Sequence, residues 1–422
     1  MPATNLAYLS VSASVIMRFA PSTVQYETLV NNDDTLSLVF IRLAEERRCQ
    51  ALRTEHGILI ALELLTKYHL RQDVTIYLWG QRNLYGGGVH FSSFAEAMKR
   101  PNFFGGLVQE INMQGQDLTD IVAQTTAQDV HILFFPLREE LPLKGAIIKW
   151  GIFEAEVLPD LYINYLSNSH LIWVPSHWAR QVLVNHGLQK EKIDVVPEGV
   201  DPTIFHPFAR DMIVKDNIFR FYMVGKKEER KGFSELLAGF KLAFNNDPNI
   251  RLYLKADNFW SDQVKKTNKN SEVMQEIEAL DLTNVNPITG QMSTQDLYLL
   301  YNYCDAVAFP TRAEGWGLPL LEGIACGIPT ITNFHSGQTE YLTAVKDKIS
   351  CLNFKLEKIK CADFIASWGE GGSWAVASPE TIAEAMIEMR ENINTWRDRA
   401  LAASAIVRVE YSWDKADRKS VV

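Results

Sequence analysis

Short apolar runs alternate with longer amphipathic stretches along most of the chain, and this alternation restricts the fold more than any other feature. In the first half, LSLVFIRL, DVTIYLWG, DVHILFFP, GAIIKWGIF and HLIWVPS have the β-branched and aromatic content of buried strands. GILIALELLTKYHL and SHWARQVLVNHG have the period of helices. Because strands alternate with helices, we expect parallel sheets with crossover helices.

A connector, VVPEGVDPTIFHPF, interrupts this alternation between Val195 and Phe208, where three prolines and one glycine exclude a helical period. The alternation then restarts with the strand-like runs FRFYMVG, IRLYLKA, DAVAFPT and PTITN. The helix-like runs GFSELLAGFKLAF, QDLYLLYNYC and PLLEGIACG lie between them. The sequence therefore predicts two doubly wound α/β domains, with the boundary in the connector.

Composition excludes several classes of protein. The 422 residues are 47% apolar and 22% charged, which is typical of globular chains, and the net charge of −9 argues against a general nucleic-acid binder. Five scattered cysteines predict reduced thiols in the cytoplasm. The first residues do not form the pattern of a signal peptide, and no run of about 18 apolar residues predicts a membrane span. Peripheral contact with a membrane stays open.

The stretch FPTRAEGWGLPLLEGIACGIPT, from Phe309 to Thr330, predicts a strand end, a glycine-bearing turn and a helix. Pro319 suits the first helical position, so the helix should begin near Leu318. Glu314 would then precede the helix, and Glu322 would lie about one turn inside it. A helix N-terminus favours an anion such as phosphate, because its free N–H groups and dipole are positive.

A basic loop follows the first strand of the second half, in MVGKKEERKGFSELL. Lys226, Lys227, Arg230 and Lys231 crowd the few residues between that strand and the next helix. Such a loop is commonly a solvated turn. In a doubly wound domain it also lies at the same sheet edge as the turn at Glu314, where its cations could bind a diphosphate.

These residues resemble a known family. RAEGWGLPLLEGIACGIPTI is similar to the E-x7-E signature of retaining glycosyltransferases of the GT-B fold, in the large family-four group. YMVGKKEERKGFSELLAGF resembles the segment that carries the diphosphate-binding basic pair, and VVPEGVDPTIFHP resembles the interdomain connector, with Glu198 where asparagine is usual. The resemblance covers about Trp150 to Trp413. It implies two Rossmann-like, doubly wound parallel-sheet domains that face each other across a cleft.

The resemblance also implies roles for individual residues. It places Glu314 at the hydroxyls of the donor sugar and Lys231 and Lys226 at the diphosphate, as the catalytic set. It places Glu322 at the nucleotide ribose. Further donor-binding residues are expected in the turn, in the basic loop and near the base: Gly315, Gly317, Leu318, Arg230 and Gly290.

The first domain departs from the family pattern. Where a glycine-rich loop is common, the chain reads LAEERRCQALRTEHG, in which Arg47 and Arg53 either bind an anionic acceptor or belong to a solvated loop. Glu154 either contacts the acceptor or donor sugar or is an exposed acid at a helix start. We expect QRNLYGGGVHF to be a loop, with YGGGVH as a turn or an acceptor-side loop.

Together, the resemblance implies a retaining, metal-independent hexosyltransferase of polysaccharide biosynthesis that needs no cofactor. The donor would be a UDP-, GDP- or ADP-sugar, and the acceptor a hydroxyl of a glycan, a lipid or a protein-linked chain. We expect an acceptor-side domain at residues 1–203, a sugar-nucleotide domain at 204–400, and a C-terminal helix at 401–422 that returns to the first domain.

Two alternatives remain. The first is a non-catalytic GT-B-fold subunit that supports a catalytic partner, and the departures in the first domain favour it. The second is a NAD-dependent oxidoreductase, which ranks last because Leu320 replaces the third glycine of a G-x-G-x-x-G motif in GWGLPL. The sequence does not specify the base, the sugar, the acceptor or the oligomeric state.

Overall fold

The computed structural model describes residues 75–83, 86–99, 107–113, 117–136, 141–208, 216–256, 269–288, 290 and 292–413. The predicted strand LSLVFIRL and helix GILIALELLTKYHL lie outside these residues, as do Arg47 and Arg53.

The first sheet has six parallel strands in the order β2-β1-β3-β4-β5-β6. We call residues 75–195 the first lobe. Its strands are β1 (Thr75–Gly80), β2 (Leu107–Asn112), β3 (Val130–Leu133), β4 (Ala146–Trp150), β5 (Leu171–Val174) and β6 (Ile193–Val195). Its helices are α4 (Gly86–Met98), α5 (Thr119–Gln124), α6 (Asp160–Ser167), α7 (His177–Asn185) and the short 3-10 helix η5 (Lys190–Lys192).

The second sheet repeats this plan in the order β12-β11-β10-β7-β8-β9, again all parallel. We call residues 219–410 the second lobe. Its sheet strands are β7 (Phe219–Val224), β8 (Ile250–Lys255), β9 (Val285–Ile288), β10 (Ala306–Phe309), β11 (Thr330–Asn333) and β12 (Ser350–Leu352). The elements between them are η7 (Glu229–Lys231), α8 (Phe233–Phe244), α10 (Lys269–Ala279), α11 (Thr294–Tyr303), α12 (Leu318–Ala325), α13 (Thr339–Val345) and η8 (Lys346–Lys348).

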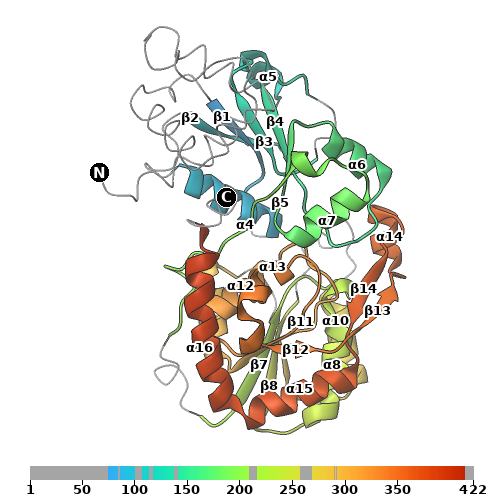
Figure 1. Cartoon of the computed structure of the whole chain (residues 1–422). Coiled ribbons are helices and arrows are strands. Elements are labelled where there is room, and N and C mark those ends of the chain that lie inside the picture. Colours follow the sequence, from blue (N-terminus) through green and yellow to red (C-terminus); the bar gives the residue numbers. More distant parts are fainter. Residues whose placement is uncertain are drawn as a thin grey trace.

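The two sheets form separate lobes, one above the other in Figure 1. Strands β3, β5, β10 and β11 are buried along their whole length. Such burial is expected of parallel strands whose two faces are both covered by helices. The predicted pair of doubly wound parallel sheets is therefore confirmed.

A small hairpin leaves the second lobe after β12. Strands β13 (Lys355–Lys358) and β14 (Ser373–Val376) pair antiparallel, and α14 (Ala362–Trp368) connects them. Figure 1 shows this segment at the edge of the second lobe that lies toward α6. The backbone N–H groups of Glu156 and Val157 donate to the carbonyl of Gly371, so the hairpin joins the two lobes.

The chain ends along the second lobe with α15 (Pro379–Glu391) and α16 (Ile393–Glu410). Helix α16 packs against α12 and α13 and spans position 401, where we placed a boundary. After it, Tyr411 accepts a hydrogen bond from Val200, and Trp413 donates one back to Val200. The domain boundaries stay predictions.

Two local predictions in the first lobe differ in outcome. Helix α7 begins after Ser176, whose side chain accepts from the Ala179 N–H as expected of an N-cap. The expected loop QRNLYGGGVHF is wrong from Gly86 onward, because the glycines open α4.

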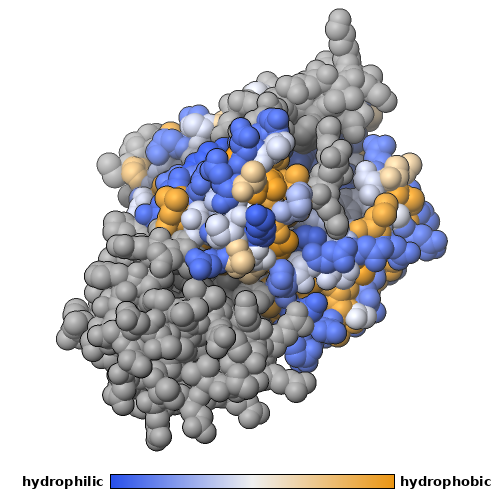
Figure 2. All heavy atoms as spheres, turned by 90° about the horizontal axis from the view of Figure 1, so that it is seen from above, coloured by the Kyte–Doolittle hydropathy of each residue, from blue (hydrophilic) through white to orange (hydrophobic). Residues whose placement is uncertain are grey.

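No helix within the described ranges is long and apolar enough to cross a membrane. Figure 2, which looks down on the molecule from above, shows hydrophilic and hydrophobic residues mixed over the described surface.

Candidate active site

A cavity of about 320 Å³ lies where the carboxyl ends of strands from both sheets meet. Doubly wound sheets bind ligands at this edge, next to the point where the strand order reverses. In the second sheet that point lies between β7 and β10, and the loops after these two strands supply most of the wall. The predicted site residues that line the cavity are Glu154, Lys226, Arg230, Lys231, Glu314, Gly315, Gly317, Leu318 and Glu322.

The N-terminus of α12 forms one wall. Gly317 is its N-cap and has φ 93°, a left-handed conformation that favours glycine, and Pro319 follows in the first turn. The hydroxyl of Tyr341 donates to the Gly317 carbonyl over 3.1 Å and fixes the turn. As predicted, the helix begins at Leu318, with Glu314 before it and Glu322 inside it. Pro319 has no N–H, and the N–H groups of Leu320 and Leu321 donate to the Gly317 carbonyl, so the helix start can offer an anion the Leu318 N–H and the positive end of the helix dipole.

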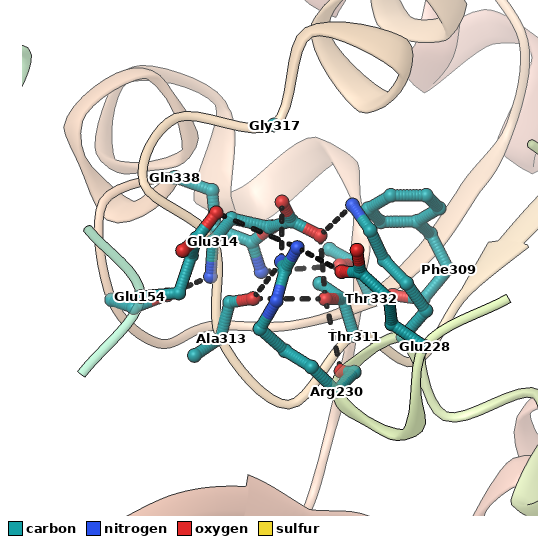
Figure 3. Close-up of polar contacts among 12 residues, drawn as sticks. Glu154, Glu228, Arg230, Phe309, Thr311, Ala313, Glu314, Gly317, Thr332 and Gln338 are labelled. Atoms are coloured by element: carbon teal, nitrogen blue, oxygen red, sulfur yellow. Dashed lines mark hydrogen bonds and ion pairs between the residues drawn. The ribbon is translucent and has the colours of Figure 1, made fainter. Parts of the chain in front are cut away.

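Glu314 is the centre of a buried ion-pair cluster, shown in Figure 3. Its Oε1 accepts from Lys231 Nζ at 2.6 Å and from the Thr311 hydroxyl at 2.6 Å. Its Oε2 accepts from Arg230 at 3.0 Å. Burial alone would raise the pKa of Glu314, but Lys231 and Arg230 outweigh it and lower the pKa to about 2. The carboxylate is ionised and keeps one acceptor position on Oε2.

Arg230 connects both lobes to this cluster. Besides Glu314, its guanidinium donates to Glu228 at 2.8 Å and to the Ala313 carbonyl at 2.7 Å. Glu154, from the first lobe, lies 3.5 Å from the same group. Figure 3 shows Glu154, Glu228 and Glu314 around the guanidinium. In this arrangement Arg230 orients three carboxylates, and its predicted donor contact stays a prediction.

Glu322 lies in a different environment. It is buried, and the Tyr301 hydroxyl donates to its Oε2 at 2.8 Å. Burial raises the pKa of Glu322 to about 7, and the hydrogen bond from Tyr301 opposes this rise. Glu322 therefore changes its charge near neutral pH, whereas Glu314 does not.

Two further lysines line the cavity beside Lys231. Lys226 belongs to the loop after β7, whereas its neighbour Lys227 pairs with Glu276 at 2.7 Å. Lys255, at the end of β8, donates to the carbonyl of Gly290, and burial lowers the pKa of Lys255 to about 8. The predicted residue Gly290 thus lies next to the cavity, held by a residue of its wall.

The N-terminus of α4, Glu198 and Lys255 are parts of the site that were not predicted from the sequence. Gly87 and Val89 line the cavity, so a second helix start faces it from the first lobe. We read the glycines as a loop because glycine is a poor helix former. The signal was present downstream: Phe91, Phe94, Ala95 and Met98 are buried and have helical spacing.

The remaining predicted residues are Glu154, Arg47 and Arg53. Glu154 lines the cavity rather than lying on the surface away from it, whereas Arg47 and Arg53 lie outside the described residues. In the described ranges, no group of three or more histidine, cysteine, aspartate or glutamate side chains could hold a metal ion.

Comparison with known proteins finds similarity in one segment. Residues 210–360 match the family model of glycosyl transferases group 1. Mannosylfructose-phosphate synthase of Agrobacterium fabrum is 26% identical over 162 residues, which are 37% of this chain and 36% of that protein. The D-inositol 3-phosphate glycosyltransferase of Segniliparus rotundus is 31% identical over 168 residues, 38% of this chain and 35% of that protein. The matched regions span little more than a third of these relatives.

Solved structures extend the likeness to the whole fold. Anabaena HepE in complex with UDP and glucose has a TM-score of 0.60 at 14% identity, over 82% of this chain and 97% of that one. Sucrose-phosphate synthase from Thermosynechococcus elongatus has a TM-score of 0.61 at 14% identity, over 82% of this chain and 96% of that one. The predicted GT-B fold is confirmed.

Proposed function

We propose that this protein is a retaining glycosyltransferase that moves a hexose-type sugar from a nucleoside-diphosphate sugar to a hydroxyl acceptor. One observation carries the proposal. Lysines 226 and 231 and the N-termini of α4 and α12 meet at one cavity, and two buried carboxylates, Glu314 and Glu322, lie in its wall. A sugar nucleotide has the matching order of groups, with a diphosphate between two sets of hydroxyls.

The cations and helix ends would bind the diphosphate and stabilise its charge as it leaves. Such preorganised groups cost little reorganisation during the reaction and act strongly in a cavity that excludes water. Lys226, Lys231 and the two helix starts could supply this stabilisation without a metal ion. The absence of a cofactor and of a metal requirement is part of this proposal.

The carboxylates would orient the hydroxyls on either side. Glu314, fixed by Lys231, Arg230 and Thr311, would accept from a hydroxyl of the transferred sugar through its remaining Oε2 position. Glu322 would accept from the ribose. Glu154 would stay an orienting partner of Arg230 at the acceptor side.

Transfer would then follow the course that the family resemblance implies. The bond between sugar C1 and the diphosphate oxygen breaks, and a bond from C1 to the acceptor oxygen forms on the same face. The acceptor proton passes to the leaving phosphate, so no enzyme nucleophile is required.

The first experiment determines which nucleotide the protein binds. HepE is described in complex with UDP and glucose, which supports a nucleotide-sugar donor and makes UDP the first candidate here. We expect one of UDP, GDP or ADP to raise the melting temperature, because a ligand that binds only the folded state stabilises it by mass action. The corresponding sugar nucleotide should also be hydrolysed slowly in the absence of an acceptor.

Matched variants separate the possible outcomes. Lys226→Ala should lower the apparent affinity for the nucleotide about tenfold, and so reduce the shift in melting temperature, because it removes a charged contact to phosphate. Lys355→Ala, in the exposed strand β13, removes the same charge away from the cavity and should have no effect. Stabilisation without hydrolysis or transfer would favour the non-catalytic subunit. No response to any nucleotide would contradict both readings.

A further inference from the structure

Glu198 is a buried carboxyl that neither the ion-pair cluster nor the helix ends use. It lies in the connector between the lobes, is 3% exposed, and belongs to the wall of the cavity. Its closest ionisable neighbour is His90 of α4, with 3.8 Å between Oε1 and Nδ1. This distance is beyond that of a hydrogen bond. Among the described residues, no hydrogen bond satisfies this carboxyl.

Burial favours the neutral form of both members of this pair. Burial raises the pKa of Glu198 well above its ordinary value, and burial lowers the pKa of His90 to about 3. The His90 ring lies among aromatic rings, 4.3 Å from Trp150 and 5.9 Å from Trp413 between centroids. A buried polar group without a hydrogen bond costs free energy unless a ligand or water completes it. The protonated carboxyl can both donate and accept, as a sugar hydroxyl can.

Tyr341 shows that Glu198 lies near the α12 turn. The pKa of the Tyr341 hydroxyl is raised by burial first and then by the nearby carboxyls of Glu314, Glu198 and Glu322, so all three lie within electrostatic range of it. The same hydroxyl donates to the carbonyl of Gly317. Glu198 therefore lines the same cavity as Glu314 and Gly317 and lies near the α12 turn, beside which the proposed function places the transferred sugar.

We propose that Glu198 binds a hydroxyl of the sugar that the donor carries and so helps to select that sugar. This inference rests on the proposed function. It adds a contact from the connector to those from Glu314 and the α12 turn, and the donor sugar would touch both lobes and the segment that joins them. The carboxyl would act in its neutral form, so an amide of the same shape should replace it.

The test compares a nucleotide with its sugar nucleotide. UDP and UDP-glucose are the first pair, with GDP and GDP-mannose and ADP and ADP-glucose as the other arms, each titrated calorimetrically. Glu198→Ala should weaken binding of the sugar nucleotide about tenfold, the loss of one hydrogen bond to a buried group, and change binding of the nucleotide less than twofold. Glu198→Gln should keep sugar-nucleotide affinity within about threefold.

Monodeoxy sugar nucleotides identify the hydroxyl. One deoxy donor should bind to the wild type about as weakly as the unmodified donor binds to Glu198→Ala. That deoxy donor should bind to Glu198→Ala no more weakly than this, because the hydrogen bond is already lost in either change alone. Melting temperatures of the free variants check that both are folded.

The possible failures differ from one another. A wild type that binds none of the nucleotides would contradict the proposed function. The wild type could bind the nucleotide normally while Glu198→Ala loses equal affinity for the nucleotide and the sugar nucleotide. That result would place the residue at the diphosphate and overturn only this inference. Sugar-nucleotide affinity unchanged in Glu198→Ala, or as weak in Glu198→Gln as in Glu198→Ala, would also overturn it.

Discussion

The two glutamates of the E-x7-E segment, one before α12 and one inside it, have environments that shift their pKa values in opposite directions. Burial raises the pKa of Glu322 to about 7, whereas Lys231 and Arg230 outweigh the effect of burial at Glu314 and hold its pKa at about 2. A spacing in the sequence cannot show this difference, because it depends on which cations fold against each carboxylate.

We predict that Glu322→Gln stabilises the protein at high pH. The folded state holds the Glu322 proton up to about pH 7, and the unfolded chain releases it near 4.5, so this group makes the wild type less stable as pH rises between these values. The variant should gain on the order of 3 kcal/mol in free energy of unfolding at pH 8 and little at pH 4.5. Denaturant unfolding at both pH values measures the difference, and an equal gain at both would contradict the assignment.

The same residue should make donor binding depend on pH. If the ionised carboxylate accepts from ribose hydroxyls, wild-type affinity for the sugar nucleotide should rise as pH increases through about 7. A sugar nucleotide is the suitable probe, because its diphosphate does not titrate in that range. Calorimetry between pH 6 and 8 should show this rise in the wild type and a flat, weaker profile in Glu322→Gln.

Glu314 behaves in the opposite sense. Its lowered pKa stabilises the fold above about pH 4.5, and this contribution is lost as pH falls toward 2. Glu314→Gln leaves Lys231 and Arg230 buried without a full countercharge and should cost about 3–5 kcal/mol at pH 7. Unfolding titrations should show that the difference in free energy of unfolding between the variant and the wild type becomes smaller below pH 4.5. Glu278→Gln, on the exposed face of α10, is the control, and a similar loss there would contradict this account.

At the scale of elements, the hairpin β13–β14 with α14 holds the wall of the cavity from outside. Trp374 of β14 is 2% exposed, packs on Phe364, and donates from Nε1 to the carbonyl of Glu154 at 3.1 Å. Because Glu154 faces Arg230 in the cavity, this one hydrogen bond links the hairpin to the ion-pair cluster.

Trp374→Ala should therefore cost about 3–5 kcal/mol through the space it leaves, and it should also lower turnover by releasing Glu154. Trp374→Phe keeps most of the ring and loses the hydrogen bond, so its cost should be about 1 kcal/mol. Thermal unfolding and transfer assays check both variants. Equal stability of the two would mean that packing of the ring is not the main contribution.

The sequence predicts the elements of the second lobe better than the site they build. Helix α12 could be placed because proline and glycine mark its start, β10 because its residues are continuously apolar, and β7 because all of its residues except Arg220 are apolar or aromatic. Helix α4 was missed because three glycines outweighed the apolar spacing that follows. Arg230 and Glu154 are 76 positions apart in the sequence (230 minus 154), so no local sequence pattern can predict that they pair.

At the scale of the whole molecule, Gly315 is a point where the two lobes approach each other closely. A Cβ added there would lie 2.6 Å from Ile152 Cγ2, which belongs to the first lobe. This distance is shorter than real Cβ contacts, so a side chain or a lobe must move. Glycine is required here by the opposite lobe rather than by its own turn.

Gly315→Ala should thus weaken donor binding about tenfold by displacing one lobe from the other, although the backbone N–H is retained. Ile152→Ala removes the obstructing methyl group and should restore part of the affinity in the double variant. Gly225→Ala is the matched control in the same cavity, since its Cβ would meet Lys231 at an ordinary 3.5 Å. If the losses of donor-binding free energy in Gly315→Ala and Ile152→Ala simply add in the double variant, this explanation is contradicted.

The paired segments at Val200 and Tyr411–Trp413 determine how the lobes can move. The chain passes between the lobes in the connector, and its end returns beside that connector in a parallel bridge between Val200 and Ser412. Because hydrogen bonds join the connector to residues 411–413 here, we expect any opening of the cleft to bend both segments together. Glu198 lies two residues before Val200, so we expect it to move least, whereas the α12 turn would move toward it as the cleft closes.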